Sequence, residues 1–399
     1  MDKPSMKENI SKLPQGFTSS GISAGLKKSG KRDLGLIHSN KPCSYAGVFT
    51  KNSIKAHCII DNLEILNNER FSENIQAIIV NSGNANACTG KEGKEALNHI
   101  QKKAAEILGL EDPKQVLTAS TGCIGIPLNH NSICNKLSTA KEQLDENYTN
   151  FSEAILTTDT KTKFASFKVG KFSIVGIAKG SGMIHPNMAT MLAFILTDAP
   201  LNSIELKEIL HKANQCSFNQ ISVDGDTSTN DMVLALANGN KQEEVDIEKI
   251  QEGFNEICTS LAKQIVADGE GATKSFEVSV KGSYPQEELR KIAKGIAASS
   301  LVKSAIFGND PNWGRVLAAA GQYAEINIET CTLKVEGITV LEMGKPTIFD
   351  RQNLVKIMKT AKFLNLTLEL NASDKGEEGS AWGCDLTYDY VKINAEYTT

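Results

Sequence analysis

The segment KGSGMIHPNMATMLAFILTDAP, residues 179–200, joins a turn-forming half to an apolar half. The first half is rich in glycine and leads into the polar stretch 185–187, which is typical of a turn. Thr190 follows the small residue Ala189 and precedes the apolar run 191–196. That run is typical of a buried strand and is far shorter than the roughly 20 residues that span a bilayer. The segment therefore predicts a turn that leads into a strand, with Thr190 at the junction.

The position of Thr190 suits a nucleophile that is released by cleavage of its own chain. A threonine hydroxyl attacks poorly until a base takes its proton, and one solution uses the α-amine of the same residue as that base. An α-amine has an ordinary pKa of about 7.7–8.0, which suits a general base near neutral pH. Freeing it requires attack of the Thr190 hydroxyl on the Ala189 carbonyl, followed by hydrolysis of the ester. Spacing alone leaves open the alternative that Thr190 is an ordinary strand residue.

Helical and strand-like patterns alternate along the rest of the sequence. Apolar or alternating runs predict strands over 77–80, 172–178, 332–340 and 366–370. Amphipathic spacing predicts helices over 92–108, 203–213, 247–267, 285–298 and 351–362. Interleaved elements of this kind predict an α/β or α+β fold built in layers. We expect a domain boundary between residues 275 and 284.

The composition is that of an ordinary globular protein. The 399 residues suit two or three domains, with 40% hydrophobic and 23% charged residues. A formal charge of −4 does not favour a nucleic-acid partner, and the N-terminus lacks the apolar core of a secretory signal. The nine cysteines contain no CxxC pair and the six histidines are isolated. We therefore expect a cytoplasmic protein with no metal, membrane or nucleic-acid partner.

A cluster of aspartates in SVDGDTSTND, residues 222–231, has two interpretations. Asp224, Asp226 and Asp231 carry the oxygen ligands that Mg²⁺ or Ca²⁺ prefers. The remaining spacing of a calcium-binding loop is missing, so we favour a role in framing a turn.

Sequence blocks along nearly the whole chain resemble those of the ornithine acetyltransferase family, the glutamate N-acetyltransferases of arginine biosynthesis. The blocks occur in the family's order: SGKRDLGLI (29–37), NSGNANACTG (81–90), STGCIG (120–125), TTDT (157–160), KGSGMIHPNMATMLAF (179–194), SVDGDTSTND (222–231), DGEGATK (268–274), FGNDPNWGRVLAA (307–319) and AWGCDLTYDYVKINAEYTT (381–399). The TTDT block departs from the pattern just downstream, where Lys161 and Thr162 replace the usual aromatic residue and proline.

The resemblance implies a fold and a processing event. The fold is an αββα sandwich related to self-activating aminopeptidases, with a smaller C-terminal α+β domain. We expect a catalytic domain over 1–280 and a second domain over 281–399. Cleavage between Ala189 and Thr190 would leave an α fragment of residues 1–189 and a β fragment of residues 190–399, which the resemblance pairs as an (αβ)₂ heterotetramer.

The resemblance also assigns roles to individual residues. It makes Thr190 the nucleophile and places the oxyanion hole, the donors that stabilise the tetrahedral intermediate, at Thr121 and Gly122. The substrate ligands that it implies are Lys179, Thr190, Glu270, Asn394, Thr399 and one threonine of the TTDT block, either Thr157 or Thr158, of which we favour Thr158. Lys179 suits a carboxylate, and Glu270 suits the cationic tail of ornithine or a hydroxyl relay in self-cleavage.

The implied activity is acetyl transfer from N2-acetyl-L-ornithine to L-glutamate through an acetyl-enzyme on Thr190. No bound cofactor is expected, and acetyl-CoA is a candidate second donor that no single residue decides. Two alternatives stay open. One is an amidase or aminopeptidase that passes the acyl group to water, and the other is an uncleaved binding protein that has lost the chemistry.

Overall fold

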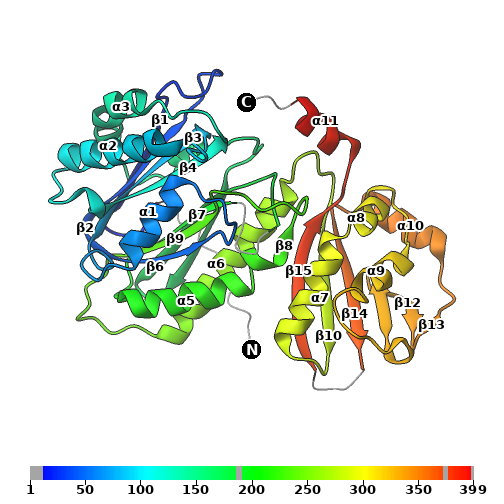
Figure 1. Ribbon diagram of the computed structural model, residues 1–399. Coiled ribbons are helices and arrows are strands. Elements are labelled where there is room, and N and C mark those ends of the chain that lie inside the picture. The colour runs from blue at the N-terminus through cyan, green and yellow to red at the C-terminus, as the bar shows by residue number, and fades with distance from the viewer. Residues whose placement is uncertain (1–11, 186–190, 372–375, 397–399) are drawn as a thin grey trace.

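The computed structural model describes residues 12–185, 191–371 and 376–396, and these residues build two β-sheets with helices packed against them (Figure 1). The first sheet has the strand order β4-β3-β2-β9-β7-β6-β5, with β1 paired to β2. Its strands are β1 (Phe17–Ile22), β2 (Leu34–Phe49), β3 (Ile75–Asn84), β4 (Val116–Cys123), β5 (Lys163–Val169), β6 (Phe172–Lys179), β7 (Leu192–Thr197) and β9 (Met232–Ala237). The pairs β3–β4 and β7–β9 are parallel, and the other neighbours are antiparallel.

The long strand β2 divides this sheet into two half-sheets. Its first half pairs with β3 and its second half with β9, and the register is irregular between His38 and Cys43. We call β1, β3, β4 and the first half of β2 the β4 half-sheet, and the second half of β2 with β9, β7, β6 and β5 the β6 half-sheet. Ile78 of β3 lies in one buried cluster with Ile177 of β6 and Phe194 of β7. The half-sheets therefore pack face to face.

Helices cover the two outer faces. Alternate strand residues such as Ile79 pack with α2 (Gly90–Leu108) and α3 (His130–Glu142) on the β4 half-sheet. On the β6 half-sheet, alternate strand residues such as Ile195 pack with α5 (Ser203–Gln215) and α6 (Ile247–Ala267). The short helices α1 (His57–Leu66) and α4 (Thr149–Ala154) contribute to the cluster between the half-sheets. The order helix, sheet, sheet, helix confirms the predicted αββα sandwich.

The second sheet has the order β13-β12-β11-β14-β10-β15-β8. Its strands are β8 (Ile221–Ser222), β10 (Ser275–Gly282), β11 (Thr332–Val335), β12 (Ile338–Glu342), β13 (Lys345–Pro346), β14 (Phe363–Leu370) and β15 (Glu377–Cys384). Its own core includes residues of four helices, α7 (Gln286–Ala298), α8 (Ser300–Phe307), α9 (Trp313–Ala320) and α10 (Arg351–Thr360). The helix α11 (Tyr388–Glu396) completes this predominantly C-terminal α+β unit (Figure 1).

The two units are joined by buried contacts. Trp382 and Cys384 of β15 belong to the same apolar cluster as α5 and α6. Within the second unit, the buried Lys303 ammonium of α8 donates to the carbonyl oxygens of Ser222 in β8 (3.0 Å) and Cys384 in β15 (2.7 Å). The boundary that we placed between residues 280 and 281 falls inside β10.

Most elements predicted from local patterns are present. The five predicted helices correspond to α2, α5, α6, α7 and α10. The single strand predicted over 332–340 was wrong in detail, because Glu336 and Gly337 have φ values of 51° and 76° and turn the chain between β11 and β12. Among the described residues we find no helix of the length and apolar character needed to cross a membrane.

Candidate active site

The two half-sheets bring the predicted site residues to one end of the sandwich. Strand β4 ends with Thr121, Gly122 and Cys123, and β6 ends with Lys179. Lys179 is the register partner of Leu192, the first residue of β7. The chain therefore resumes beside Lys179 after residues 186–190. Ala189, Thr190 and Thr399, the predicted cleavage site, nucleophile and C-terminal ligand, lie outside the described residues.

The backbone at Gly122 admits only glycine. Its φ is 134°, in a region that residues with a side chain rarely adopt. A Cβ atom there would lie 2.3 Å from the carbonyl carbon of Gly83 on the neighbouring strand β3. Gly122 therefore lets β4 approach β3 closely, and the predicted oxyanion-hole pair sits on a tightly packed turn.

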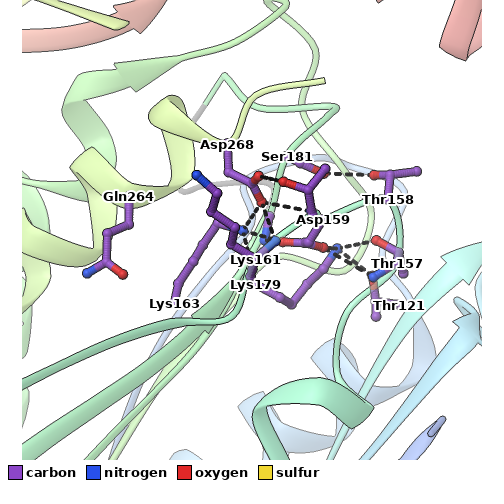
Figure 2. A network of polar contacts seen from close by, with 12 residues as sticks. Thr121, Thr157, Thr158, Asp159, Lys161, Lys163, Lys179, Ser181, Gln264 and Asp268 are labelled. Carbon is purple, nitrogen blue, oxygen red and sulfur yellow. Dashed lines mark hydrogen bonds and ion pairs between the residues drawn. The ribbon is translucent and has the colours of Figure 1, made fainter. Parts of the chain in front are cut away.

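Lys179 connects the predicted oxyanion hole with the TTDT block, as Figure 2 shows. Its Nζ donates to Oγ1 of Thr157 at 2.7 Å and to Oγ1 of Thr121 at 3.3 Å. A hydroxyl has one proton and can accept two hydrogen bonds. Because Thr121 accepts from Lys179, its own proton is free to donate to a third group. That is the property an oxyanion-hole hydroxyl needs.

The Lys179 side chain is buried. Burial lowers the pKa of Lys179, and the Asp159 carboxylate, whose Oδ2 lies 3.8 Å from Nζ, opposes that shift. Burial alone would raise the pKa of Asp159, but Lys179, Lys163 and the N–H of Gly180 outweigh it and hold that pKa well below its usual range. Lys179 therefore faces an ionised carboxylate.

Asp159 also belongs to a buried ion-pair network (Figure 2). The Lys163 Nζ lies 2.7 Å from Oδ1 of Asp159 and 2.6 Å from Oδ2 of Asp268. Asp268 also accepts hydrogen bonds from the backbone N–H of Thr160 and Lys161. The network ties the loop before β5 to the loop after α6, which carries Glu270.

A second chain of contacts runs from Thr158 to the C-terminal helix. Thr158 Oγ1 and Ser181 Oγ are 2.7 Å apart, and the Ser181 carbonyl accepts the backbone N–H of Glu270 at 2.9 Å. The Glu270 carboxylate accepts a hydrogen bond from Asn394 Nδ2 at 2.8 Å. A Cβ on Gly182 would lie 2.3 Å from that carboxylate. The structure thus brings Thr158, Glu270 and Asn394 to the same region.

Asp224 frames the chain that leads into residues 186–190. Its carboxylate accepts the backbone N–H groups of Met183 at 2.6 Å and Ile184 at 2.8 Å. These two hydrogen bonds frame the turn at Met183 and Ile184, and the preference for that role over a metal site stays a prediction. Within 12–185, 191–371 and 376–396, no group of three or more His, Cys, Asp or Glu side chains is placed to hold a metal ion.

Comparison with known proteins identifies the family. The model of the ArgJ family matches residues 18–399. The arginine biosynthesis bifunctional protein ArgJ of Bacillus thuringiensis subsp. konkukian (strain 97-27) is 46% identical, over 97% of this chain and 96% of that protein. The chain belongs to the ArgJ family.

Other ArgJ proteins agree with this assignment. The ArgJ protein of Gloeobacter violaceus (strain ATCC 29082 / PCC 7421) is 45% identical, over 96% of this chain and 97% of that protein. A crystal structure of ArgJ from Bacillus halodurans is 42% identical, with a TM-score of 0.50, and covers 52% of this chain and 100% of the solved chain. Membership confirms the family predicted from the sequence blocks, an acyltransferase family of arginine biosynthesis, and with it the prediction that the chain is an enzyme.

Sequence reasoning about this ArgJ-family chain missed the residues that hold the site together. Asp159, Lys163, Ser181 and Asp268 had no predicted role, although all of them except Lys163 lie inside the quoted blocks. The one local signal was the i,i+4 spacing of Asp159 and Lys163. The pairing of Lys163 with Asp268 spans more than 100 residues and left no trace in the local pattern.

Proposed function

We propose that this enzyme transfers acetyl from N2-acetyl-L-ornithine to L-glutamate, using Thr190 after self-cleavage at Ala189–Thr190. The observation that supports it best is the contact of Lys179 with Thr121. It brings a cation and a free hydroxyl donor together beside the strand that follows Thr190. Such a pair suits a reaction in which a carboxylate is bound and an oxyanion forms.

Self-cleavage and acetyl transfer both use the Thr190 hydroxyl oxygen as the nucleophile. The Thr190 hydroxyl attacks the Ala189 carbonyl, the peptide nitrogen becomes the free α-amine, and water hydrolyses the ester. In the mature enzyme that amine takes the hydroxyl proton, and the oxygen attacks the acetyl carbonyl of acetylornithine. Thr121 and Gly122 donate to the oxyanion, and ornithine leaves with a proton. The glutamate amine then attacks the acetyl ester, which yields N-acetylglutamate and frees Thr190.

The length of a solved relative supports cleavage near the middle of the chain. The Bacillus halodurans chain is matched over its whole length but covers only 52% of this chain. Full-length relatives cover 97%. Residues 190–399 amount to just over half of the 399 residues. A fragment that begins at Thr190 therefore fits the length of the solved chain.

Sheet pairing supports lasting association of the two fragments. Strand β7, at the start of the β fragment, pairs with β6 of the α fragment over six register positions, 174–179 with 197–192. Strand β9 of the β fragment likewise pairs with β2 of the α fragment. Separating the fragments would expose the buried core of the sandwich. We extend this to an (αβ)₂ assembly in the cytoplasm.

Charge suggests how the substrates are oriented. Lys179 supplies a cation for the substrate carboxylate. Glu270, held by Asn394, supplies an anion for the ammonium group of ornithine. Thr157 contacts Lys179, and Thr158 contacts Ser181, whose carbonyl accepts the backbone N–H of Glu270. The family resemblance adds Thr399, which lies outside the described residues, to the proposed ligands.

The test combines mass measurement with a transfer assay. Purified wild-type protein should give two fragments, with Thr190 at the N-terminus of the second, and should move labelled acetyl from acetylornithine to glutamate faster than to water. Thr190→Ala should stay intact and inactive, whereas Thr367→Ala on β14 of the second sheet should behave as wild type. A cleaved Thr190→Ala protein would overturn the mechanism. Faster release of acetate than transfer would favour the hydrolase, and acetyl-CoA in place of acetylornithine tests the second donor.

A further inference from the structure

Lys27 lies in the loop between β1 and β2, where lysines are usually solvated, yet its side chain is half-buried. Its Nζ donates to the carbonyl oxygens of Leu156 at 2.7 Å and Arg32 at 2.8 Å. The contact with Leu156 joins residues 129 positions apart in the chain. Leu156 directly precedes Thr157, whose hydroxyl accepts from Lys179.

The loop is built to present Lys27. The buried carboxylate of Asp33 accepts the backbone N–H groups of Ala24 at 2.5 Å, Leu26 at 2.6 Å and Lys27 at 2.9 Å. Burying a carboxylate costs free energy unless hydrogen bonds satisfy it, and here three backbone donors do so. Asp33 therefore fixes the backbone from which the Lys27 side chain starts. The SGKRD block that contains Asp33 has no other role in the proposed mechanism.

Lys27 also packs behind the predicted oxyanion hole. A Cβ on Gly83 would lie 3.3 Å from Cγ of Lys27, so the lysine stem passes over that glycine. Gly83 in turn packs against Gly122. One side chain thus contacts both the Leu156 carbonyl, next to the TTDT block, and the strand that supports the Thr121–Gly122 turn.

We propose that Lys27 is a positioning residue for acetyl transfer. Its ammonium holds the Leu156 carbonyl, and this contact keeps the Thr157 hydroxyl where it orients Lys179 toward Thr121. This inference rests on the proposed function. Lys27 also adds positive charge near Lys179, while the Asp159 carboxylate is already engaged by Lys163. This excess positive charge favours binding of the substrate carboxylate and formation of the oxyanion.

The charge of Lys27 is sensitive to mild alkali. Burial lowers the pKa of Lys27 to about 8; Lys179 and Lys31 add to the lowering, and Asp33 and Asp159 oppose it. Of these four groups, Lys31 and Asp33 lie in the same loop as Lys27, and Lys179 and Asp159 belong to the candidate site. The charge is present below about pH 8 and is lost as the pH rises through that value. Activity that depends on it therefore falls on the alkaline side.

The experiment compares neighbouring lysines. Lys27→Met is set against Lys28→Met, because Lys28 is adjacent and exposed. Loss of hydrogen bonds from a charged group should lower kcat/KM for acetylornithine about ten- to a hundredfold in Lys27→Met, with the pattern of fragments unchanged. Lys28→Met should match wild type. Equal kinetics of the two variants would overturn the proposal.

A conservative variant separates positioning from folding. Lys27→Arg keeps the donor and the charge at all working pH values. It should recover most of the activity and lose the alkaline fall near pH 8. An Arg variant with the wild-type pH profile would contradict the role of the Lys27 charge, even if Lys27→Met failed to fold. Wild-type protein without any acetyl transfer would instead reject the proposed function.

Discussion

Replacing Lys163 by methionine should be among the most damaging single changes outside the apolar core. The Lys163 side chain is 1% exposed and lies between Asp159 (0%) and Asp268 (6%). It donates to both carboxylates and to the Lys161 carbonyl at 3.2 Å. Methionine fills a similar volume but leaves two buried carboxylates facing each other.

The expected loss follows from burial. Removing one partner of a buried ion pair costs about 3–5 kcal/mol, because an uncompensated charge stays in the interior. Two carboxylates lose the same cation here, so we expect a loss of at least about 3 kcal/mol. The matched control is Lys103→Met on α2, whose partner Glu106 lies 2.9 Å away on the exposed helix face. Surface pairs of this kind contribute about 0–1 kcal/mol.

The assay is urea unfolding followed by circular dichroism, with intact mass recorded so that variants are compared in the same cleavage state. The double variant Lys163→Met, Asp268→Asn should recover part of the loss, because one of the two uncompensated carboxylates is gone and Asp159 still has Lys179 beside it. A loss below about 1 kcal/mol for Lys163→Met, as for the surface control, would refute the reasoning. So would a double variant no more stable than Lys163→Met alone.

At acid pH, the difference in free energy of unfolding between wild type and Lys163→Met should become smaller. The pKa of Asp159 is depressed in the folded protein, against about 3.9 when unfolded. Its contribution to stability is therefore present above about pH 4 and is lost as the pH falls through the folded value. Wild type gives up this contribution in acid, whereas the variant has already lost part of it.

Three further changes test the site. Gly122→Ala should abolish self-cleavage and transfer, since a Cβ would lie 2.3 Å from the Gly83 carbonyl carbon; intact mass and activity check this, and an active Ala variant would contradict the close packing. Lys179→Met should reduce turnover more than self-cleavage, as measured by transfer kinetics and fragment yield; equal damage to both would assign Lys179 to processing. Asp224→Asn should slow self-cleavage about tenfold, because a neutral amide oxygen accepts the Met183 and Ile184 N–H groups more weakly; cleavage at the wild-type rate in a time course by mass would refute this.

Local patterns predicted much of the fold because helices and strands depend on neighbours in sequence. The helix predicted over 247–267 coincides with α6, since its apolar residues recur at helical spacing. The pattern failed at 332–340, where one alternating run holds a hairpin turn at Glu336 and Gly337. Alternation continues through such a turn, so hydrophobicity alone does not reveal it.

The candidate site was likewise predicted only in part from the sequence. The resemblance of the quoted blocks to the family implied that Thr121, Gly122, Lys179 and Glu270 are site residues. No pattern in those blocks predicted that Lys179 would contact Thr121 or that Asp159 would share Lys163 with Asp268. The roles of these residues stay predictions until the variants are measured.

By itself, the sequence determined the family, because the order and identity of its blocks carry the resemblance, and the resemblance in turn implied the αββα class and the nucleophile Thr190. Only the tertiary structure decided which charges are buried together and which hydroxyl each cation contacts. Lys27 reaches Leu156, and Lys179 reaches Thr121, across 129 and 58 positions of the chain. Such contacts arise when two half-sheets close on one core, and the free energy of burial that holds them is a property of the packed molecule.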